Sequence, residues 1–284
     1  MSDPGTLSVP EIFQGQPCVR LHHASGDSAL VALHGGQVLS WTAGGIERLY
    51  LSPKAVMDGK TAIRGGVPVC FPQFNQRGPL AKHGFVRNLP WVAGPAQSEG
   101  EATVAVFSLH SDAATHALWP HDFVARLVVR LSAGGLQLDF SVDNTGTAPL
   151  EFTVALHSYF RTSAIADVRV DGLEGQPVWD SLTDTHAVQA GPVYFTQEFD
   201  GVYQAAANPL TLVDGVTGLR IAQSPNLGQT VVWNPGAILC GKLADMPPDG
   251  YKQMVCVEAA QIDAPVAVAA GARWAGWQHL SVAG

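Results

Sequence analysis

The sequence has few charged residues, no long apolar run and no surplus of positive charge. Lys, Arg, Asp and Glu together make up 14% of its 284 residues, and the formal net charge is −8. Nucleic-acid phosphates and anionic lipid surfaces repel a protein of net negative charge, so we expect neither as a partner. No apolar run approaches the ~20 residues of a transmembrane helix, and residues 1–10 lack the basic and apolar regions of a signal peptide. We therefore predict a cytoplasmic protein.

Cysteines and cofactor-binding motifs are also scarce. The four cysteines, Cys18, Cys70, Cys240 and Cys256, show no CxxC spacing. Cys70 and Cys256 lie in apolar runs, where a buried free thiol is the commoner state. The sequence contains no HExxH, no P-loop and no GxGxxG between a strand and a helix. It therefore predicts reduced core cysteines, no metal centre and no cofactor.

Turn-forming residues are abundant, and they separate many short apolar segments. The 30 glycines and 19 prolines are spread along the whole chain. Residues 136–142 alternate between apolar and polar side chains, which predicts a strand with one buried face. Residues 123–131 precede this strand across the Gly-containing segment 132–135, so the two segments predict a β-hairpin. Similar runs recur at residues 29–33, 102–109, 152–156, 168–170, 219–222, 230–233, 254–257 and 266–270.

Amphipathic helical segments are nearly absent, and no repeat or Pro-rich linker divides the chain. Short strands at regular spacing with turn residues between them are typical of β-sandwiches and β-barrels. We therefore predict an all-β protein in which residues 1–284 form a single antiparallel domain.

The Gly- and Pro-rich segment 63–74, with its continuation over residues 82–88, is the most unusual part of the sequence. It places Arg64, Gln73, His83 and Arg87 among aromatic residues in predicted loops. Polar groups on loops above a rigid scaffold suit a small polar ligand. Arg64 and Arg87 could clamp an anion, because guanidinium groups match the geometry of phosphate oxygens. Equally, both could be surface residues in segments where Pro only shapes turns.

Two residues in strand-like segments are candidates for proton transfer. His157 directly follows the apolar run 152–156, and an imidazole fixed at a strand end suits a general acid, although a His there is more often structural. Glu258 ends the strand-like run 254–258, and a carboxylate buried in this way is either paired or has a raised pKa suited to proton transfer. Asp200, in the turn-like segment 198–203, is either an acceptor for sugar hydroxyls or an ordinary turn residue.

The segments that carry these residues resemble one known family. IRGGVPVCFPQF, KHGFVRN, LHSYF, EFDGVY, VVWNP and MVCVEAAQI occur in the order found in the glucose-6-phosphate 1-epimerase branch of the galactose mutarotase-like superfamily. The resemblance runs from about residue 33 to the end of the chain. Generic galactose mutarotases lack the Arg-bearing RGG…FVR pattern, so this difference indicates a phosphorylated substrate.

The resemblance implies a fold and a reaction. The fold is the antiparallel β-supersandwich of the superfamily. His157 matches the family's catalytic acid, and Glu258 matches its catalytic base. Arg64 and Arg87 match the positions that hold the 6-phosphate. The implied function is the cofactor-free interconversion of the α and β anomers of a hexose 6-phosphate, with glucose 6-phosphate as the first candidate.

Three further residues match positions that contact sugar hydroxyls in the family, namely Gln73, His83 and Asp200. The chain departs from the family pattern in two places. An insertion-like stretch, residues 75–78, follows the FPQF motif, and Gly236 stands where the family often has Trp. Both departures bear on the sugar pocket and hence on the preference among hexose phosphates. We expect the protein to be a monomer.

Three other functions remain open. The nearest is an aldose 1-epimerase for unphosphorylated sugars, in which the two Arg are structural. The second is a non-catalytic sugar-phosphate-binding protein, which has no need of a matched acid and base. The third is a metal-dependent cupin-type enzyme, which metal analysis of the purified protein would test.

Overall fold

The computed structural model describes residues 7–215 and 217–283, whose strands pair into three antiparallel sheets. The first sheet has the order β1 (Ser8–Phe13), β2 (Gln16–His22), β3 (Ser28–Ala32), β4 (Gln37–Ala43), β5 (Ile46–Glu47). The second has the order β17 (Val193–Tyr194), β14 (Val168–Asp171), β19 (Leu210–Asp214), β20 (Thr217–Gln223), β23 (Arg273–Val282), β11 (Gly135–Asn144), β10 (Phe123–Ser132), β9 (Ala102–His110), β7 (Val92–Ala93), with β8 (Gln97–Glu99) also paired to β9.

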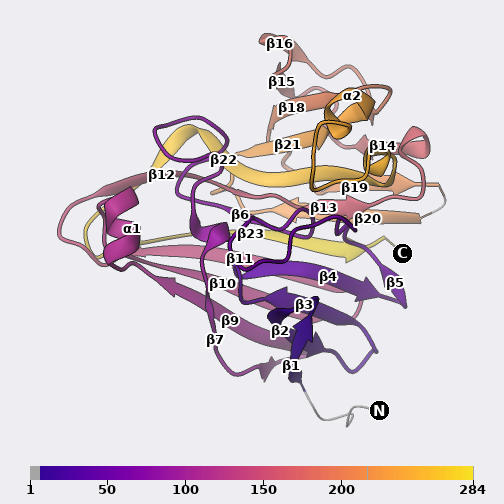
Figure 1. Ribbon diagram of the computed structural model, residues 1–284. Coiled ribbons are helices and arrows are strands. Elements are labelled where there is room, and N and C mark those ends of the chain that lie inside the picture. Colours follow the sequence, from indigo (N-terminus) through magenta and orange to yellow (C-terminus); the bar gives the residue numbers. More distant parts are fainter. Residues whose placement is uncertain (1–6, 216, 284) are drawn as a thin grey trace.

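The third sheet carries Asp200 and Glu258, which are discussed below. Its order is β16 (Thr185–Val188), β15 (Pro177–Asp180), β18 (Phe199–Gln204), β21 (Gln229–Asn234), β22 (Met254–Val268), β12 (Leu150–Leu156), β6 (Val69–Cys70), with β13 (Tyr159–Arg161) also paired to β22. Helices are short: α1 (Ala113–Leu118), α2 (Gly236–Cys240) and three 3₁₀ turns, η1 (Val86–Asn88), η2 (Ile165–Asp167) and η3 (Gly250–Gln253). Figure 1 shows β15, β18 and β21 at one end of the molecule and β1 to β3 at the other.

The predicted hairpin is confirmed. β10 and β11 pair from Phe123 opposite Asn144 to Ser132 opposite Gly135. The alternation in residues 136–142 corresponds to alternating burial, with the apolar residues in the core and the polar residues half-buried. Hydrophobic burial of one face therefore fixes the register of this pair.

Aromatic residues join the second and third sheets. The ring of Phe71 packs edge-on against Phe123 of β10, Phe140 of β11 and Phe152 of β12, with ring centres 5.5, 5.7 and 4.9 Å apart. Edge-to-face contacts at these distances are favourable. They anchor the FPQF segment to the core, so the loop that follows it starts from a fixed point.

One strand is longer than the sequence indicated. The apolar runs 254–257 and 266–270 were predicted to be separate strands, but β22 extends from Met254 to Val268 and so includes the first and part of the second. A register shift between Phe152 and Val154 of β12 accommodates the irregular stretch of β22. Such a bulge lets a strand continue past a Pro, here Pro265, which resembles a turn residue in the sequence.

The four cysteines are buried and free, as predicted. No helix among residues 7–215 and 217–283 has the length and apolar character needed to cross a membrane.

Segment 63–67 passes close to two other parts of the chain because it contains two adjacent glycines. Gly66 has a φ of +62°, and a Cβ atom there would lie 2.1 Å from the carbonyl oxygen of Val38. Its amide donates to the carbonyl of Tyr50 over 2.7 Å, and its carbonyl accepts from the amide of Tyr159 over 2.9 Å. These contacts fix the backbone beside Arg64.

Gly66→Ala is expected to destabilise the protein much more than Gly100→Ala. Gly100 has almost the same φ, +61°, but a Cβ there would meet no described atom within 4 Å. Gly100→Ala therefore measures the backbone cost alone, ~1–2 kcal/mol. Gly66→Ala adds a clash with a carbonyl and should cost at least ~2 kcal/mol more. Urea denaturation measures both free energies, and equal losses would mean that the close approach at Gly66 is not a constraint.

Candidate active site

The candidate site is a cavity of about 340 Å³ over one face of the third sheet, called the main cavity below. Its volume lies at the lower end of the ~300–1,000 Å³ typical of small-molecule sites. Side chains of β15, β18, β21 and β22 form the floor. The walls come from Arg64, from residues 74–87, and from Leu239 of α2 and Leu243 after it. Loops above a rigid sheet therefore enclose the cavity, as the sequence predicted.

Strand pairing places the floor residues in a row. Glu258 of β22 is opposite Val231 of β21, which is opposite Val202 of β18. Val202 is in turn opposite Trp179 of β15. Because neighbouring strands are ~4.8 Å apart, the row extends ~14 Å from Glu258 to Trp179.

Glu258 and His157 form a buried pair at one end of this row. Oε1 of Glu258 lies 3.3 Å from Nε2 of His157, and the side chains are 1% and 9% exposed. His157 directly follows β12, as predicted, whereas Glu258 lies within β22 and not at the end of a strand. Oε2 of Glu258 and Nδ1 of His157 have no hydrogen-bond partner among residues 7–215 and 217–283. Leaving such atoms unpaired is costly, so each is free to bind a polar ligand.

Burial shifts the pKa values of the pair in opposite directions. It raises the pKa of Glu258 well above its ordinary value, and the nearby Asp200 carboxylate raises it further. It lowers the pKa of His157, and the charges of Arg87 and Arg64 lower it further. Both shifts favour neutral side chains. Burial therefore favours the state in which Glu258 carries the proton and His157 is neutral.

Aromatic contacts fix the imidazole of His157. It stacks on the ring of Tyr159 with centres 4.8 Å apart and planes within 8°, and it meets the rings of His83 and Trp233 edge-on. His83 has a positive φ, +66°, and its Nδ1 accepts from the amide of Asn75 over 3.3 Å. Burial lowers the pKa of His83 to about 2, so His83 is neutral and its Nε2 carries the proton. His83 therefore acts as a hydrogen-bond donor at the cavity.

Arg64 and Arg87 both line the cavity. Nε of Arg64 pairs with Asp245 over 3.1 Å, and its Nη1 donates to the hydroxyl of Tyr159 over 3.0 Å. Nη2 of Arg87 donates to the carbonyl of Lys82 over 2.9 Å. Nε of Arg87 is buried without a hydrogen-bond partner in the described part of the chain. Both guanidinium groups are thus held in place, and each keeps donor capacity.

The remaining two predicted site residues lie in different surroundings. Asp200 lines the cavity, but it belongs to β18, opposite Trp233, and not to a turn. Burial raises its pKa. Gln73 is absent from the described cavity lining, because its amide bonds to the loop itself: it donates to the carbonyls of Asn75 and Leu80 and accepts from the amide of Leu80. The side chain of Gln73 thus shapes the loop and does not face the cavity.

Several lining residues were not singled out in the sequence. Lys82 and Arg77 add two cations to the wall, and Trp179 and Trp233 add aromatic surface. Trp233 stands in the quoted VVWNP motif, and Lys82 begins KHGFVRN. Arg77 belongs to the stretch 75–78 that departs from the family pattern, although the residue itself was not singled out. Trp179 carried no comparable signal, because it lies near no other candidate in the sequence.

His157, Cys256 and Glu258 are the residues best placed to hold a metal ion. Their ligand atoms lie within 4.8 Å of one another, and all three side chains are buried. Zinc binds such groups when the thiol is ionised. Burial raises the pKa of Cys256 well above its ordinary value, so a metal would have to displace a strongly held proton.

The chain is similar to proteins of one family. The family model for aldose 1-epimerase matches residues 17–281. A protein of Cenchrus ciliaris named "Putative glucose-6-phosphate 1-epimerase" is 37% identical over 275 residues, which cover 93% of this chain and 84% of that protein. The crystal structure of "a putative mutarotase" from Salmonella typhimurium has a TM-score of 0.89 and 30% identity, and the match covers 98% of this chain and 94% of that one.

A galactose mutarotase-like protein from Clostridium acetobutylicum is only 15% identical, yet it has a TM-score of 0.77 over 99% of both chains. This likeness confirms the predicted all-β, galactose mutarotase-like fold.

Glu258→Gln is expected to stabilise the fold, increasingly so as the pH rises. Because the pKa of Glu258 lies above its ordinary 4.5, the folded state keeps a proton that the unfolded chain releases. Above pH ~4.5 the folded state therefore loses stability, by up to ~1.4 kcal/mol per pH unit until its own pKa is passed. Gln suffers no such loss. Urea denaturation of both proteins at about pH 4, 5.5 and 7 measures the difference.

Glu11→Gln provides a control of opposite sign. The ion pair with Arg20 lowers the pKa of Glu11, so its stabilising contribution is present above pH ~4.5 and is lost as the pH falls. Gln at this position should therefore reduce stability at neutral pH. If the Glu258→Gln effect did not change with pH, Glu258 would not be the buried titrating group.

Proposed function

This chain belongs to the aldose 1-epimerase family, and we propose that it interconverts the α and β anomers of a hexose 6-phosphate, with glucose 6-phosphate as the first candidate. The observation that carries the proposal is the buried pair of Glu258 and His157, in which each side chain keeps one polar atom without a partner among the described residues. A carboxyl and an imidazole held side by side are what reversible opening of a hemiacetal ring requires.

Anomerisation needs two proton transfers. The C1 hydroxyl must lose its proton, and the ring oxygen O5 must gain one. In our proposal, Glu258 removes the proton from O1 while His157 protonates O5, rotation about C1–C2 presents the other face of the aldehyde, and the roles reverse on closure. Each positioned acid or base typically contributes ~10²–10⁴-fold. The reaction neither oxidises carbon nor transfers a group, so its chemistry requires no cofactor.

Binding of the phosphate would prepare the pair for this step. Without ligand, burial favours the proton on Glu258, whereas the mechanism needs it on His157. The charges of Arg64 and Arg87 lower the pKa of His157, but those acting on Glu258 come from Asp200 and Lys82. A phosphate neutralising the two Arg would therefore raise the pKa of His157 selectively. The number of protons on the pair stays the same, and only their position changes.

The other lining residues suit the rest of the substrate. Neutral His83 can donate to a sugar hydroxyl, and Asp200 can accept from one. The phosphate held at one end would position C1 and O5 at the catalytic pair, so that binding energy distant from C1 is used for orientation. The name of the Cenchrus ciliaris relative, which specifies glucose 6-phosphate, agrees with this substrate.

One observation favours a second candidate, an aldose 1-epimerase for unphosphorylated sugars. Arg64 already pairs with Asp245 over 3.1 Å, so part of its charge is balanced inside the protein. If the ion pair with Asp245 were the only role of Arg64, this residue would be structural and the substrate would carry no phosphate. Glucose as a parallel substrate distinguishes the two candidates.

Wild-type protein is expected to accelerate anomer exchange of glucose 6-phosphate, and Glu258→Gln is expected to lose ~10²–10⁴-fold of that rate, because Gln cannot accept the O1 proton. NMR saturation transfer between the anomeric protons measures the exchange directly. Glu11→Gln, outside the described cavity lining, serves as the matched control. Equal rates for wild type and Glu258→Gln would remove Glu258 as the base and favour a sugar-phosphate-binding protein.

Arg64→Ala is expected to raise KM for glucose 6-phosphate by ~10-fold or more, because a charged hydrogen bond to phosphate is worth ~1.5–3 kcal/mol. The same change should leave kcat/KM for glucose nearly constant. Steady-state kinetics on both sugars measures the two effects, and Arg20→Ala controls for the loss of one ion-paired Arg elsewhere. An unchanged KM for glucose 6-phosphate would contradict the assignment of Arg64 to the phosphate.

A further inference from the structure

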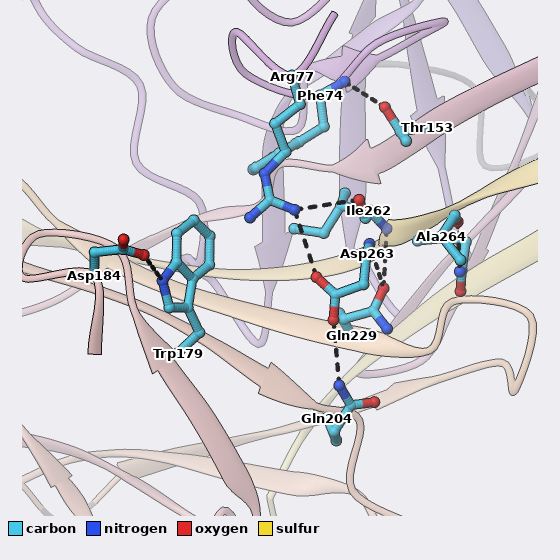
Figure 2. A network of polar contacts seen from close by, with 11 residues as sticks. Phe74, Arg77, Thr153, Trp179, Asp184, Gln204, Gln229, Ile262, Asp263 and Ala264 are labelled. Atoms are coloured by element: carbon cyan, nitrogen blue, oxygen red, sulfur yellow. Dashed lines mark hydrogen bonds and ion pairs between the residues drawn. The ribbon is translucent and has the colours of Figure 1, made fainter. Parts of the chain in front are cut away.

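The stretch 75–78, which departs from the family pattern, contributes Asn75 and Arg77 to the wall of the main cavity. The guanidinium carbon of Arg77 lies 4.5 Å from the ring centre of Trp179. Nη1 of Arg77 also donates to the carbonyl of Ile262 over 3.2 Å and pairs with Asp263 over 3.4 Å. Figure 2 shows Arg77 reaching from its loop toward Ile262 and Asp263 of β22, with Trp179 of β15 on its other side.

A second cavity lies behind this contact. It has a volume of about 300 Å³ and is called the side cavity here. Arg77, Trp179 and Val202 line both the main and the side cavity. Val202 belongs to the floor that the two cavities share. Above the sheet, the main cavity is therefore separated from the side cavity by the contact between Arg77 and Trp179. Removing either side chain would join the two spaces.

The contact between Arg77 and Trp179 is called the partition here. Hydrogen bonds on the side of the side cavity hold both of its residues. The indole Nε1 of Trp179 donates to Asp184 over 2.9 Å. Asp263, the partner of Arg77, accepts from Gln204 over 3.3 Å. Arg77 is 29% exposed and Asp263 44%, so the ion pair itself contributes little to stability. Its effect is to fix where the planar guanidinium stands, which a Lys ammonium could not reproduce.

The partition stands opposite the reacting carbon. Glu258 and Trp179 are the two ends of the floor row, ~14 Å apart across three strand spacings. With C1 at Glu258 and the pyranose ring lying along the row, C4, the ring atom opposite C1, is directed toward Trp179. Substituents on O4 would therefore meet the partition, whereas substituents on O2, next to C1, would remain near Glu258.

We propose that Arg77 and Trp179 determine which sugars this site accepts: the pair closes the main cavity against substituents on O4, and the side cavity is a binding site for such a substituent once the partition is opened. The side cavity offers Asp184, His186 and Gln204, which are groups able to bond sugar hydroxyls. The substrate class is thereby limited to single hexose units. This inference rests on the proposed function for the position of C1.

The test uses glucose 6-phosphate that carries a benzyl ether on O4. For Arg77→Ala, the ratio of kcat/KM for this probe to kcat/KM for glucose 6-phosphate should exceed the wild-type ratio by ~10-fold or more, a size typical of opening a pocket to an extra apolar group. Trp179→Ala should give the same gain without altering the loop. It keeps the test valid if Arg77→Ala folds poorly.

Two controls separate opening of the partition from general loosening. Arg20→Ala, which removes an ion-paired Arg from β2, should leave the ratio at its wild-type value. The isomer with the benzyl ether on O2 should gain nothing from Arg77→Ala. A gain for both isomers, or for neither, would overturn the proposal. A large rise in KM for glucose 6-phosphate in Arg77→Ala would also overturn it, because Arg77 would then hold the phosphate.

Binding measurements test the partition independently of whether the protein catalyses anomer exchange. If wild-type protein does not accelerate anomer exchange, the proposed function fails, but titration calorimetry with the O4 and O2 benzyl probes still examines the partition. Tighter binding of the O4 probe alone, by ~10-fold or more in Arg77→Ala, would support the partition in a protein that only binds sugar phosphates. Unchanged binding would reject it.

Discussion

A carboxyl group buried within a β-strand is the constraint on which the site depends. Glu258 is 1% exposed, and one of its oxygens has no partner in the described part of the chain. Such a group is tolerated only where the surrounding structure is rigid and stable. The neighbouring strands β21 and β12 supply that rigidity through antiparallel pairing. The sheet thus holds the carboxyl in place, and burial raises its pKa.

The walls meet a different requirement from the floor. Arg64, His83 and Arg87 must project from irregular backbone, and irregular backbone is stable only when its own polar groups are satisfied. Gly66 allows a close approach to β4, and the amide of Gln73 bonds three times within its loop. These contacts therefore fix the irregular backbone that carries the cations. Both halves of an acid–base site need this precision, because small displacements reduce catalysis strongly.

Features that depend on a short stretch of sequence are predicted correctly, whereas site residues that are brought together by distant contacts are missed. The alternation in β11 and the strand before His157 are local patterns, and both are confirmed. Asp200 resembled a turn residue because Gly follows it, yet β18 pairs on both sides and overrides that preference. Arg77 contacts Ile262, 185 positions away, so no sequence window contains the two. Contacts of this kind depend on the packing of the whole fold.

Four cationic side chains line the main cavity, although the protein as a whole has a net negative charge. The net charge is −8, so the long-range field does not attract an anionic sugar, and it is screened beyond ~8–10 Å at physiological salt. The main cavity is nonetheless lined by Arg64, Arg77, Lys82 and Arg87 against Glu198, Asp200 and Glu258. Recognition of an anion must therefore come from short, desolvated contacts, which salt weakens little. Two of these cations, Arg64 and Arg87, lower the pKa of His157. In the proposed mechanism an anion balances them, so the charge that identifies the substrate also sets the proton in position for the reaction.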